Sequence, residues 1–388
     1  MENQKANYKP PGHQLYVTRP GVLFKIFSKN KISRSKFGLV LRVCLFSILT
    51  WPLQLLQRIV YFFKLRNVSF EGKEPVFILG HWRSGTTHIH YLMSKDPHFG
   101  FLSNFQSFFF NISSFGYGWL DKLLSPYTAQ VRPQDNMDFT VLAPQEEEQV
   151  VSNISDAASV HSFYFPENSR YFDKFNLFEG IKDKDLKRWQ RAYLYVLKGI
   201  THMAKGKRLV IKNPNNTGRI RQLLQLFPNA KFVYIHRNPY SVYLSTLHLY
   251  RVVLNDQSFQ EVNITKNQDM IIRNYKKIQQ AYLRDRALIP KGNLVEIAYD
   301  QIGEGSLDLF KQIYQTLNLD SLEEALPYVQ SYLSTIQNYK KNKFIPIEDK
   351  MVARIQKEWK FAFDEFGYDN RYIDTTQATV KSSEKKKI

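Results

Sequence analysis

Short apolar runs bounded by turn residues recur through the middle of the chain, and each run predicts a buried strand. The runs cover residues 76–79, 209–211, 231–236 and 293–299. Apolar residues at helical spacing occupy the segments 86–93, 217–226, 306–317 and 351–366, and also the stretch from residue 241 onward. Strand, helix and strand in succession form a βαβ unit, whose strands lie parallel. The pattern therefore predicts an α/β fold built on a parallel sheet.

The first strand leads directly into a glycine loop and a helix. Gly80 and Gly85 are separated by four residues, as in the phosphate-binding loop of nucleoside triphosphatases, but Thr86 stands where that loop carries Lys. That lysine reaches the β- and γ-phosphates, whereas loop N–H groups and a helix N-terminus can hold a single phosphate without it. The loop residues available for this are Arg83, Ser84, Gly85, Thr86 and Thr87. The loop predicts a site for a nucleotide with one 5′-phosphate and a transferable anionic group, and the alternative is an ordinary glycine turn.

A second candidate site lies after the strand at 231–236. Arg237 follows this strand directly, and Ser245 lies eight residues later, about two helical turns along. Ligands of open α/β sheets bind beyond the carboxyl ends of the strands, and the planar fork of Arg suits a phosphate group. Arg237 and Ser245 therefore form a second candidate phosphate site, with a surface cation at a helix start as the alternative.

These two stretches resemble one known family. The segment GHWRSGTTHIHYLM at 80–93 is similar to the 5′-phosphosulfate loop of sulfotransferases that use 3′-phosphoadenosine 5′-phosphosulfate (PAPS), in the bacterial style G-H-x-R-S-G-T-T. The Arg237 and Ser245 pair resembles the family's 3′-phosphate motif, and Lys212-Asn213-Pro214 resembles its K-x-P. The likeness covers roughly residues 75–368. It implies one α/β domain similar to nucleotide kinases, with helices on both faces of the parallel sheet.

The resemblance also implies a reaction, the transfer of a sulfuryl group from PAPS to a hydroxyl or amine without a metal. Arg83, Ser84, Gly85, Thr86 and Thr87 would hold the 5′-phosphosulfate, Arg237 and Ser245 the 3′-phosphate, and Lys212 would add to nucleotide binding. Arg83 would also offset the charge that develops on the departing oxygen. A small-molecule kinase and a non-enzymatic peripheral membrane protein with a relic nucleotide fold are the alternatives. The kinase would need ATP and magnesium, and Thr86 argues against it.

The transfer also needs a group that accepts the proton of the acceptor hydroxyl. Pro144-Gln145 and three following glutamates resemble the family's P-x-E-[DE]-E, and Glu146 is our candidate base. The sequence does not separate Glu146 from Glu147 or Glu148, and three adjacent carboxylates also fit a solvated helix start. A His commonly follows the K-x-P by two residues in the family, whereas this chain has Asn216 there. His81 is therefore a secondary catalytic candidate.

Residues 37–63 form an apolar segment with a basic flank. Its longest uncharged stretch, 43–57, has 15 residues, which is short of the roughly 20 that cross a bilayer. On a helical wheel one side collects the polar residues Arg42, Thr50, Gln54, Gln57 and Arg58. An amphipathic helix with a basic flank is typical of a membrane-surface element. We favour this hypothesis over a helix packed on its own domain and over a membrane span.

The charge balance of the chain bounds its partners. The 388 residues carry a formal net charge of +19, which implies an anionic partner such as a nucleotide or an acidic membrane surface. Nucleic acid is disfavoured because no zinc-finger or helix-turn-helix signal is present. Cys44 is the only cysteine, which excludes an intrachain disulfide and favours a reducing compartment. We therefore expect a cytoplasmic protein, with peripheral attachment to the cytoplasmic membrane face as a further hypothesis.

The expected organisation has four parts: a basic arm at 1–36 whose first 19 residues are loose, the amphipathic helix at 37–63, a sulfotransferase domain at 70–370 and a basic disordered tail at 371–388. The Phe-rich stretch 99–119 fits either core packing or an apolar acceptor pocket. The helix and this stretch favour a hydrophobic acceptor such as a lipid alcohol, with a sugar as the alternative. The basic run 339–343 fits either a nucleotide cover or a solvated loop.

Overall fold

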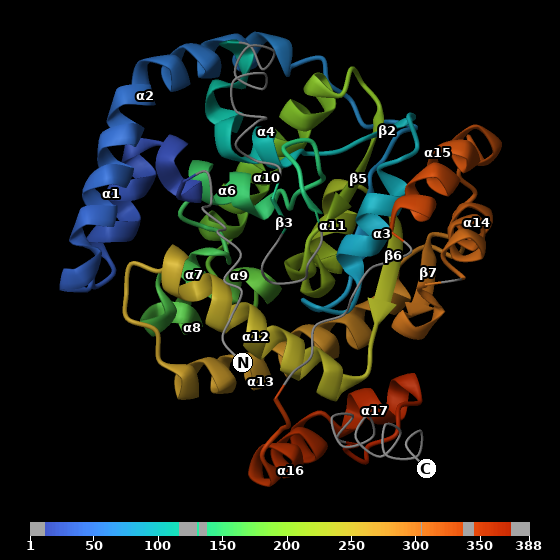
Figure 1. The fold of residues 1–388 in the computed structure, drawn as a ribbon. Helices are drawn as coiled ribbons and strands as arrows, with labels where there is room; N and C mark the ends of the chain where they lie inside the picture. Colours follow the sequence, from blue (N-terminus) through green and yellow to red (C-terminus); the bar gives the residue numbers. More distant parts are fainter. Residues whose placement is uncertain (1–11, 116–129, 132–137, 304, 337–344, 374–388) are drawn as a thin grey trace.

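The computed structural model describes residues 12–115, 130–131, 138–303, 305–336 and 345–373. At the centre of these residues lies a five-stranded parallel sheet with helices on both sides (Figure 1). Its order is β2 (Phe99–Gly100), β5 (Arg208–Lys212), β1 (Val76–Leu79), β6 (Lys231–His236) and β7 (Leu294–Ala298). A short antiparallel pair, β3 (Gln130–Val131) and β4 (Asp138–Phe139), lies apart from it. The predicted α/β fold is confirmed.

Strand β1 shows why the sheet needs helices on both faces. Successive side chains of a strand point to opposite sides, and all four side chains of β1 are fully buried. Val76 and Ile78 belong to one core cluster, with α3 (Thr86–Met93), α14 (Ser306–Thr316) and α15 (Leu322–Thr335). Phe77 and Leu79 belong to the other, with α10 (Asp183–Met203) and α11 (Ile220–Leu226). A continuous apolar run is the pattern expected of a strand covered on both faces.

Two predicted helices are interrupted in the structure. The segment predicted at 217–226 is a 3-10 turn, η6 (Pro214–Gly218), followed by α11. The segment predicted at 351–366 is two helices, α16 (Asp349–Glu358) and α17 (Lys360–Phe366). Trp359 between them is fully buried, stacks on Tyr275 with 3.9 Å between ring centroids, and donates its indole N–H to the Ile272 carbonyl at 3.1 Å. Both partners lie on α13 (Ile264–Asp285), which packs with α12 (Pro239–Gln257).

The N-terminal segment is packed from Gly12 onward, so the expectation of a loose arm up to Arg19 is wrong for the described residues. Leu15 and Ile26 are buried in the larger core cluster, and the His13 ring bonds to the Gln257 carbonyl at 3.0 Å. The turn η1 (Gln14–Val17) and the helix α1 (Pro20–Ser28) carry these apolar residues inward. The basic tail from residue 374 onward lies outside the described residues.

The remaining helices connect these layers. They are η2 (Arg34–Lys36), α2 (Phe37–Lys64), α4 (Asn104–Phe109), η3 (Phe110–Phe115), α6 (Glu148–Ile154), α7 (His161–Tyr164), η5 (Pro166–Asn168), α8 (Ser169–Phe172), α9 (Lys174–Leu177), η7 (Arg286–Leu288) and η8 (Tyr299–Gln301). Of these, α2 runs along the outside of the molecule (Figure 1). Its buried side chains include Ser47, Gln54 and Gln57, whereas most of its large apolar side chains are exposed.

Candidate active site

The glycine loop between β1 and α3 has a backbone shape that depends on its glycines. Gly80 and Gly85 have φ angles of 138° and 101°, in the region that favours glycine. A Cβ atom at Gly80 would lie 2.5 Å from the Ile235 carbonyl oxygen, and one at Gly85 would lie 2.7 Å from the Tyr299 ring. Arg83 also has a positive φ, 72°, which is uncommon for a residue with a side chain. Such strain recurs at ligand-binding loops.

The predicted residues of this loop have different environments. Ser84 is buried, and its hydroxyl donates to the His81 carbonyl at 2.7 Å, so its side chain holds the loop together. Thr86 is buried and Thr87 half-buried, both in the first turn of α3. Gly85 is the residue before this helix. The N-terminus of α3 and the loop therefore meet at the carboxyl end of β1, as a phosphate cradle requires.

The two predicted phosphate stretches come together in the structure. Strands β1 and β6 are neighbours in register, with Leu79 opposite Tyr234, so the segments that follow them start side by side. Arg83 Nε donates to Ser245 Oγ at 2.8 Å, and an Arg237 guanidinium N–H donates to the Arg83 carbonyl at 3.1 Å. Arg83 is more than 150 positions away from both Arg237 and Ser245 along the chain. Two cations and a hydroxyl thus form one site beside the loop.

Tyr299 belongs to the same site, and the sequence analysis did not select it. The Arg237 guanidinium carbon lies 3.9 Å from the centroid of the Tyr299 ring, a cation–π contact. The same ring approaches Gly85. Tyr299 follows β7 as Arg237 follows β6, and these strands are paired. The position of Tyr299 at a strand's carboxyl end was the signal that could have identified it.

Glu146 pairs with Lys212 at this edge of the sheet. Lys212 Nζ lies 2.5 Å from Glu146 Oε1, and the two side chains are 6% and 17% exposed. Lys212 ends β5 and lies opposite Ile78 of β1, so the pair sits next to the strand that carries the loop. Lys212, predicted to bind the nucleotide, and Glu146, predicted to act on the acceptor, lie together in the structure.

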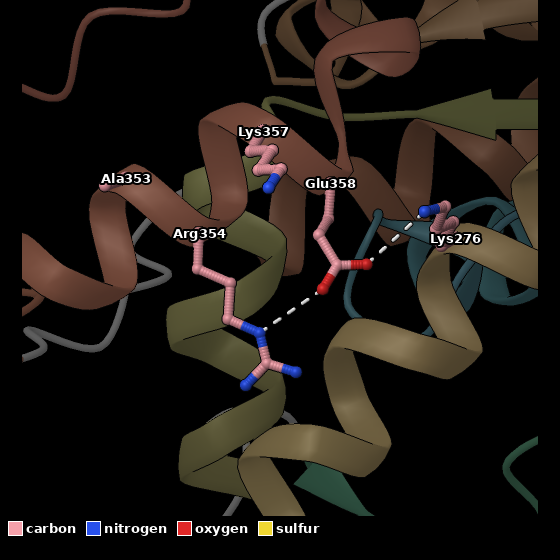
Figure 2. Close-up of a pocket in the computed structure, with 5 residues that line it drawn as sticks. All are labelled: Lys276, Ala353, Arg354, Lys357 and Glu358. Carbon is pink, nitrogen blue, oxygen red and sulfur yellow. Dashed lines mark hydrogen bonds and ion pairs between the residues drawn. The ribbon is translucent and has the colours of Figure 1, made fainter.

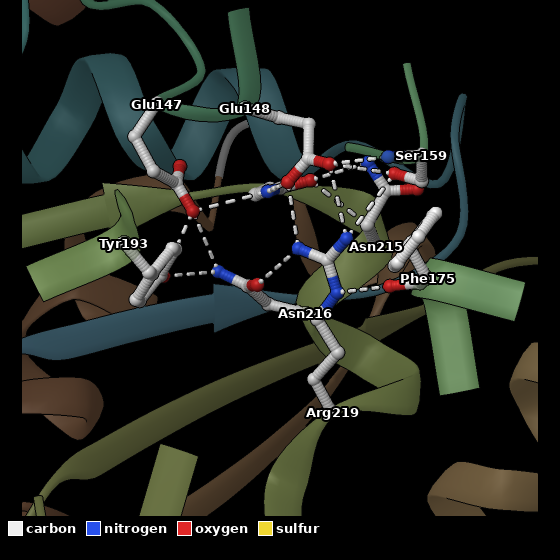
Figure 3. Close-up of polar contacts among 9 residues, drawn as sticks. Glu147, Glu148, Ser159, Phe175, Tyr193, Asn215, Asn216 and Arg219 are labelled. Atoms are coloured by element: carbon white, nitrogen blue, oxygen red, sulfur yellow. Dashed lines mark hydrogen bonds and ion pairs between the residues drawn. The ribbon is translucent and has the colours of Figure 1, made fainter. Parts of the chain in front are cut away.

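Glu147 and Glu148 have the opposite environment, because both are fully buried (Figure 3). Arg219 donates to the two oxygens of Glu148 at 2.6 and 3.0 Å, and Ser159 adds two bonds of 2.8 Å. Burial opposes the ionisation of Glu148, but the charge and hydrogen bonds of Arg219 hold its pKa below the usual value. The alternative of a solvated helix start therefore does not hold for these two residues.

Glu147 accepts hydrogen bonds from the neutral partners Tyr193 at 2.9 Å and Asn216 at 2.8 Å (Figure 3). Burial, with the nearby charge of Glu148, raises the pKa of Glu147. Among the described residues its second oxygen has no hydrogen-bond partner. Of the three glutamates, only Glu146 is at the edge of the site beside the loop.

His81 is 1% exposed and lies edge-on to Tyr275, with 5.0 Å between centroids. One ring nitrogen contacts the Trp82 carbonyl at 3.0 Å. Burial lowers the pKa of His81 to about 4, so the ring is neutral at physiological pH. Its Nε2 is buried and has no hydrogen-bond partner among the described residues, and the catalytic role of His81 stays a prediction.

A cavity of about 530 Å³ lies away from the loop, between α13 and α16 (Figure 2). It is lined by Lys276, Ala353, Arg354, Lys357 and Glu358. Glu358 is bonded by Arg354 and Lys276, each at 3.4 Å. The lining thus consists mainly of long side chains that pair across the surface. Within the described ranges, no group of three or more His, Cys, Asp or Glu residues could hold a metal ion.

Comparison with known proteins decides the family of this site. A family model described as "Sulfotransferase family" matches residues 75–324, which is more than half of the chain. The chain belongs to the sulfotransferase family. This membership makes it an enzyme that transfers a sulfuryl group, with PAPS as the donor that the family implies. The kinase and non-enzymatic alternatives are set aside.

Proteins similar to this sulfotransferase include mycobacterial sulfotransferases. It is 26% identical over 349 residues to the omega-hydroxy-beta-dihydromenaquinone-9 sulfotransferase Stf3 of Mycobacterium bovis, covering 89% of this chain and 88% of that one, and equally to Stf3 of Mycobacterium tuberculosis. Among solved structures, STF9 of Mycobacterium avium has a TM-score of 0.66 at 16% identity, over 91% of this chain and 97% of that one. STF1 of Mycobacterium tuberculosis has 0.60 at 18%, over 80% and 85%. These structures share the fold.

Asn216 stands where the resemblance led us to expect a histidine, and in this sulfotransferase it is part of the buried network. Its amide donates to Glu147 and to Tyr193, and its oxygen accepts from Arg219 at 3.2 Å. Asn216 is fully buried. The three hydrogen bonds of the Asn216 side chain fix the position of η6, the turn that contains this residue and follows β5. The segment 132–137, between β3 and β4, and the basic run 339–343 lie outside the described residues.

Proposed function

We propose that this site transfers the sulfuryl group of PAPS to the hydroxyl of a lipid alcohol at the cytoplasmic face of a membrane. The observation that carries the proposal is the contact among Arg83, Arg237 and Ser245 beside the glycine loop. Two guanidinium groups, a hydroxyl and a helix N-terminus at one place suit a ligand with two separate anionic groups. An adenosine with a 5′-phosphosulfate and a 3′-phosphate has this charge pattern.

The donor would be held at both ends. Arg83, Thr86 and Thr87, with the N–H groups of the loop, would bind the 5′-phosphosulfate. Arg237 and Ser245 would bind the 3′-phosphate, since a hydroxyl that accepts a bond from Arg83 can still donate its own proton. Arg83 carries a permanent charge and would stabilise the negative charge on the oxygen that leaves when its bond to sulfur breaks.

Glu146 would act as the base. As the acceptor oxygen bonds to sulfur, its proton moves to the Glu146 carboxylate, and adenosine 3′,5′-bisphosphate leaves. Lys212, at 2.5 Å from Glu146, keeps this carboxylate oriented and adds a positive charge where the sulfuryl group crosses. We prefer Glu146 to Glu147 and Glu148 because the oxygens of these two bond within the buried network (Figure 3).

The acceptor class rests on the relatives and on the apolar surface. The name of Stf3, to which the chain is similar over nearly its whole length, gives an omega-hydroxylated dihydromenaquinone as the acceptor of that protein. The Phe-rich segment of this chain supplies α4 and η3, which lead toward Glu146 through the bond from Gln145 to Asn104 at 2.9 Å. Apolar side chains of this segment would line an approach to Glu146, which would suit a hydrophobic chain that ends in a hydroxyl.

The proposal is tested with PAPS labelled in its sulfate, incubated with total lipid and glycan extracts. We expect label in the organic-soluble fraction with the wild type and none with Arg83→Ala. Arg237→Ala should weaken the binding of adenosine 3′,5′-bisphosphate by about 1.5–3 kcal/mol, because a charged hydrogen bond is lost, while the binding of adenosine 5′-phosphate changes little. Circular dichroism checks that both variants fold.

Label in the glycan fraction alone would overturn the acceptor class and leave the reaction intact. Unchanged turnover by Arg83→Ala would overturn the role of the loop. Equal loss of both nucleotides in Arg237→Ala would overturn the assignment of the 3′-phosphate.

A further inference from the structure

The helix α2 has its polar side against the protein and its apolar side outward, the reverse of an ordinary surface helix. We infer that the outward face of α2 is a lipid-binding surface that lies in the plane of the membrane interface. The occupant is the headgroup and upper acyl region of an anionic bilayer. The suggestion that the lipid alcohol is drawn from this same bilayer rests on the proposed function. The lipid-binding surface itself is inferred from the contacts of α2 with the rest of the protein and from the exposure of its outer side.

The inner side of α2 is fixed to the body by hydrogen bonds of neutral polar groups. The Gln57 amide donates to the Phe110 carbonyl, and its oxygen accepts from the Ser114 N–H at 2.9 Å. The Tyr61 and Ser113 hydroxyls are 2.7 Å apart. Gln57 and Tyr61 are fully buried. These bonds determine which side of the helix faces inward, so the apolar side cannot turn toward the protein without leaving buried polar groups unpaired.

Nearer its start, α2 is held by η1 in the same way. Ser47 Oγ donates to the Thr18 carbonyl at 2.6 Å, and Ser47 is fully buried. Gln54, which is 1% exposed, donates to the same Thr18 carbonyl at 3.4 Å. The attachment therefore extends along both halves of the helix, on either side of Pro52.

The outer side of α2 exposes a continuous row of large apolar side chains. They are Phe37, Leu41, Leu45, Phe46, Ile48, Leu49, Leu53, Leu55, Leu56, Ile59, Phe62 and Phe63. Leu41 is 70% exposed and Leu49 64%. Phe24 of α1, at 75%, is also exposed. Soluble monomers rarely expose an apolar patch of this extent, and such a patch marks an interaction site.

The charge around the patch identifies the partner. Residues 3–70 contain twelve Lys and Arg and no Asp or Glu. Exposed cations lie before the helix, at Lys25, Lys31 and Arg34, and at its end, at Lys64 and Arg66. An apolar row flanked by cations is complementary to anionic headgroups over an acyl layer. A second copy of the same surface would bring like charges together, which disfavours self-association.

The contacts of the inner side of α2 also favour a helix that lies on the membrane over one that crosses it. Residues Arg34–Lys64 form the one helix in the described part of the chain that is long and apolar enough to cross a membrane by length and composition, and 17% of its apolar window is buried. To cross, α2 would have to leave η1 and η3, and Gln57 would enter the acyl layer without the Phe110 and Ser114 backbone groups that it bonds, which is unfavourable. In-plane binding keeps every one of these bonds.

The surface is tested by flotation of the full chain with vesicles of phosphatidylcholine and phosphatidylglycerol. The variant Leu41→Gln/Leu45→Gln/Leu49→Gln removes apolar side chains from the outer face only. Its matched control, Ile264→Gln/Leu288→Gln/Tyr328→Gln, removes three exposed apolar side chains elsewhere on the surface. We expect at least about tenfold weaker partitioning of the first variant and no change in the control.

Lys25→Gln/Lys31→Gln/Arg34→Gln should weaken binding to these vesicles and leave binding to pure phosphatidylcholine unchanged.

The orientation of α2 is tested with single cysteines. Cys44 is the only cysteine, so Cys44→Ser gives a background for a fluorophore at Leu41→Cys, Leu49→Cys or Ile59→Cys. Lipids that carry a quencher at a known depth then locate each fluorophore. An in-plane helix places all three at a similar shallow depth. A depth that increases toward the middle position, with the two ends on opposite sides, would overturn in-plane binding.

Two further outcomes separate the surface from the reaction. Sulfation of a short water-soluble alcohol should be unchanged in the Leu41→Gln/Leu45→Gln/Leu49→Gln variant, since none of these residues touches the site. A wild type that transfers sulfate but does not float would overturn the lipid surface and leave the reaction. A wild type that floats but transfers no sulfate would overturn the reaction alone. A wild-type dimer in solution that the same three substitutions separate would assign the face to a second copy and overturn the proposal.

Discussion

Glu146 and Glu148 are two residues apart, and each pairs with a basic side chain, yet the two pairs have different environments. The pair of Glu146 and Lys212 lies beside the glycine loop with one partner 17% exposed. The pair of Glu148 and Arg219 is completely enclosed, with exposures of 1% and 0%. A pair at the edge of a site can exchange its partner for a substrate, whereas an enclosed pair can only support the fold. The difference shows that environment, not residue type, separates a candidate base from a structural acid.

The largest effect on stability is expected at the enclosed pair. Glu148→Ala leaves the Arg219 charge buried without its partner, which costs about 3–5 kcal/mol of unfolding free energy. Urea unfolding measures the loss. Arg219→Met, which removes the other partner, should destabilise the protein by a similar amount. A loss below 1 kcal/mol in both variants would show that the pair does not support the fold.

Replacement of Glu146 should act on the reaction instead. Glu146→Gln is expected to lower kcat by about 10²–10⁴-fold, because the amide accepts no proton. The unfolding free energy should change by about 1 kcal/mol, since the amide oxygen can still accept a bond from Lys212. Transfer of labelled sulfate and urea unfolding give the two values. A variant that keeps its kcat would move the base to another residue.

The inner side of α2 gives a third and smaller effect. Gln57→Leu removes a neutral amide and leaves the Phe110 carbonyl and the Ser114 N–H unpaired, which should cost about 1–3 kcal/mol. Thermal unfolding of the wild type and the variant measures the difference. The matched change Arg58→Leu, at an exposed position on the same helix, should leave stability within about 0.5 kcal/mol. Equal stability of the two variants would mean that α2 is not held by Gln57.

The smallest effect is expected at Glu147, and its sign depends on pH. Burial raises the pKa of Glu147 in the folded state. The folded state therefore binds this proton more tightly than the unfolded state, and the stability it contributes is lost as pH rises from the unfolded pKa through the folded pKa. Glu147→Gln, which resembles the protonated acid, should change stability little in acid and increase it by up to about 1 kcal/mol above the folded pKa. A variant that is less stable at alkaline pH would contradict this sign.

The parallel sheet and the two candidate phosphate-binding stretches were predictable because their signals are local. A buried strand, a glycine spacing and an Arg after a strand each occupy a few consecutive residues, and parallel pairing brings their ends together. The choice among the three glutamates was not predictable, because it depends on Tyr193, Asn216 and Arg219, which lie 46 to 71 residues away. Tyr299 was missed for a similar reason, since its contact with Arg237 is made between the ends of two strands.

The helix at 37–63 shows the limit of periodicity most clearly. The pattern of polar residues correctly predicted a helix with two different sides. It did not predict which side packs on the protein. The partners of Gln57 are backbone groups of η3, and the hydrophobic pattern of a sequence does not show where backbone groups lie. Helix α10 has the opposite arrangement to α2: it buries the apolar residues Trp189 and Leu197 and turns its charged residues outward. The periodicity of polar residues shows that a helix has two different sides, and the tertiary contacts show which of the two sides packs on the protein.

The ring of Tyr299 has a consequence for how the enzyme would release its nucleotide. Its ring centroid lies 3.9 Å from the guanidinium carbon of Arg237, and the ring also limits the space at Gly85, so it borders both halves of the proposed nucleotide site. A displacement of η8, which begins with this residue, would loosen both halves in the same movement. Both phosphate groups of the bisphosphate product would then dissociate together, and not one after the other.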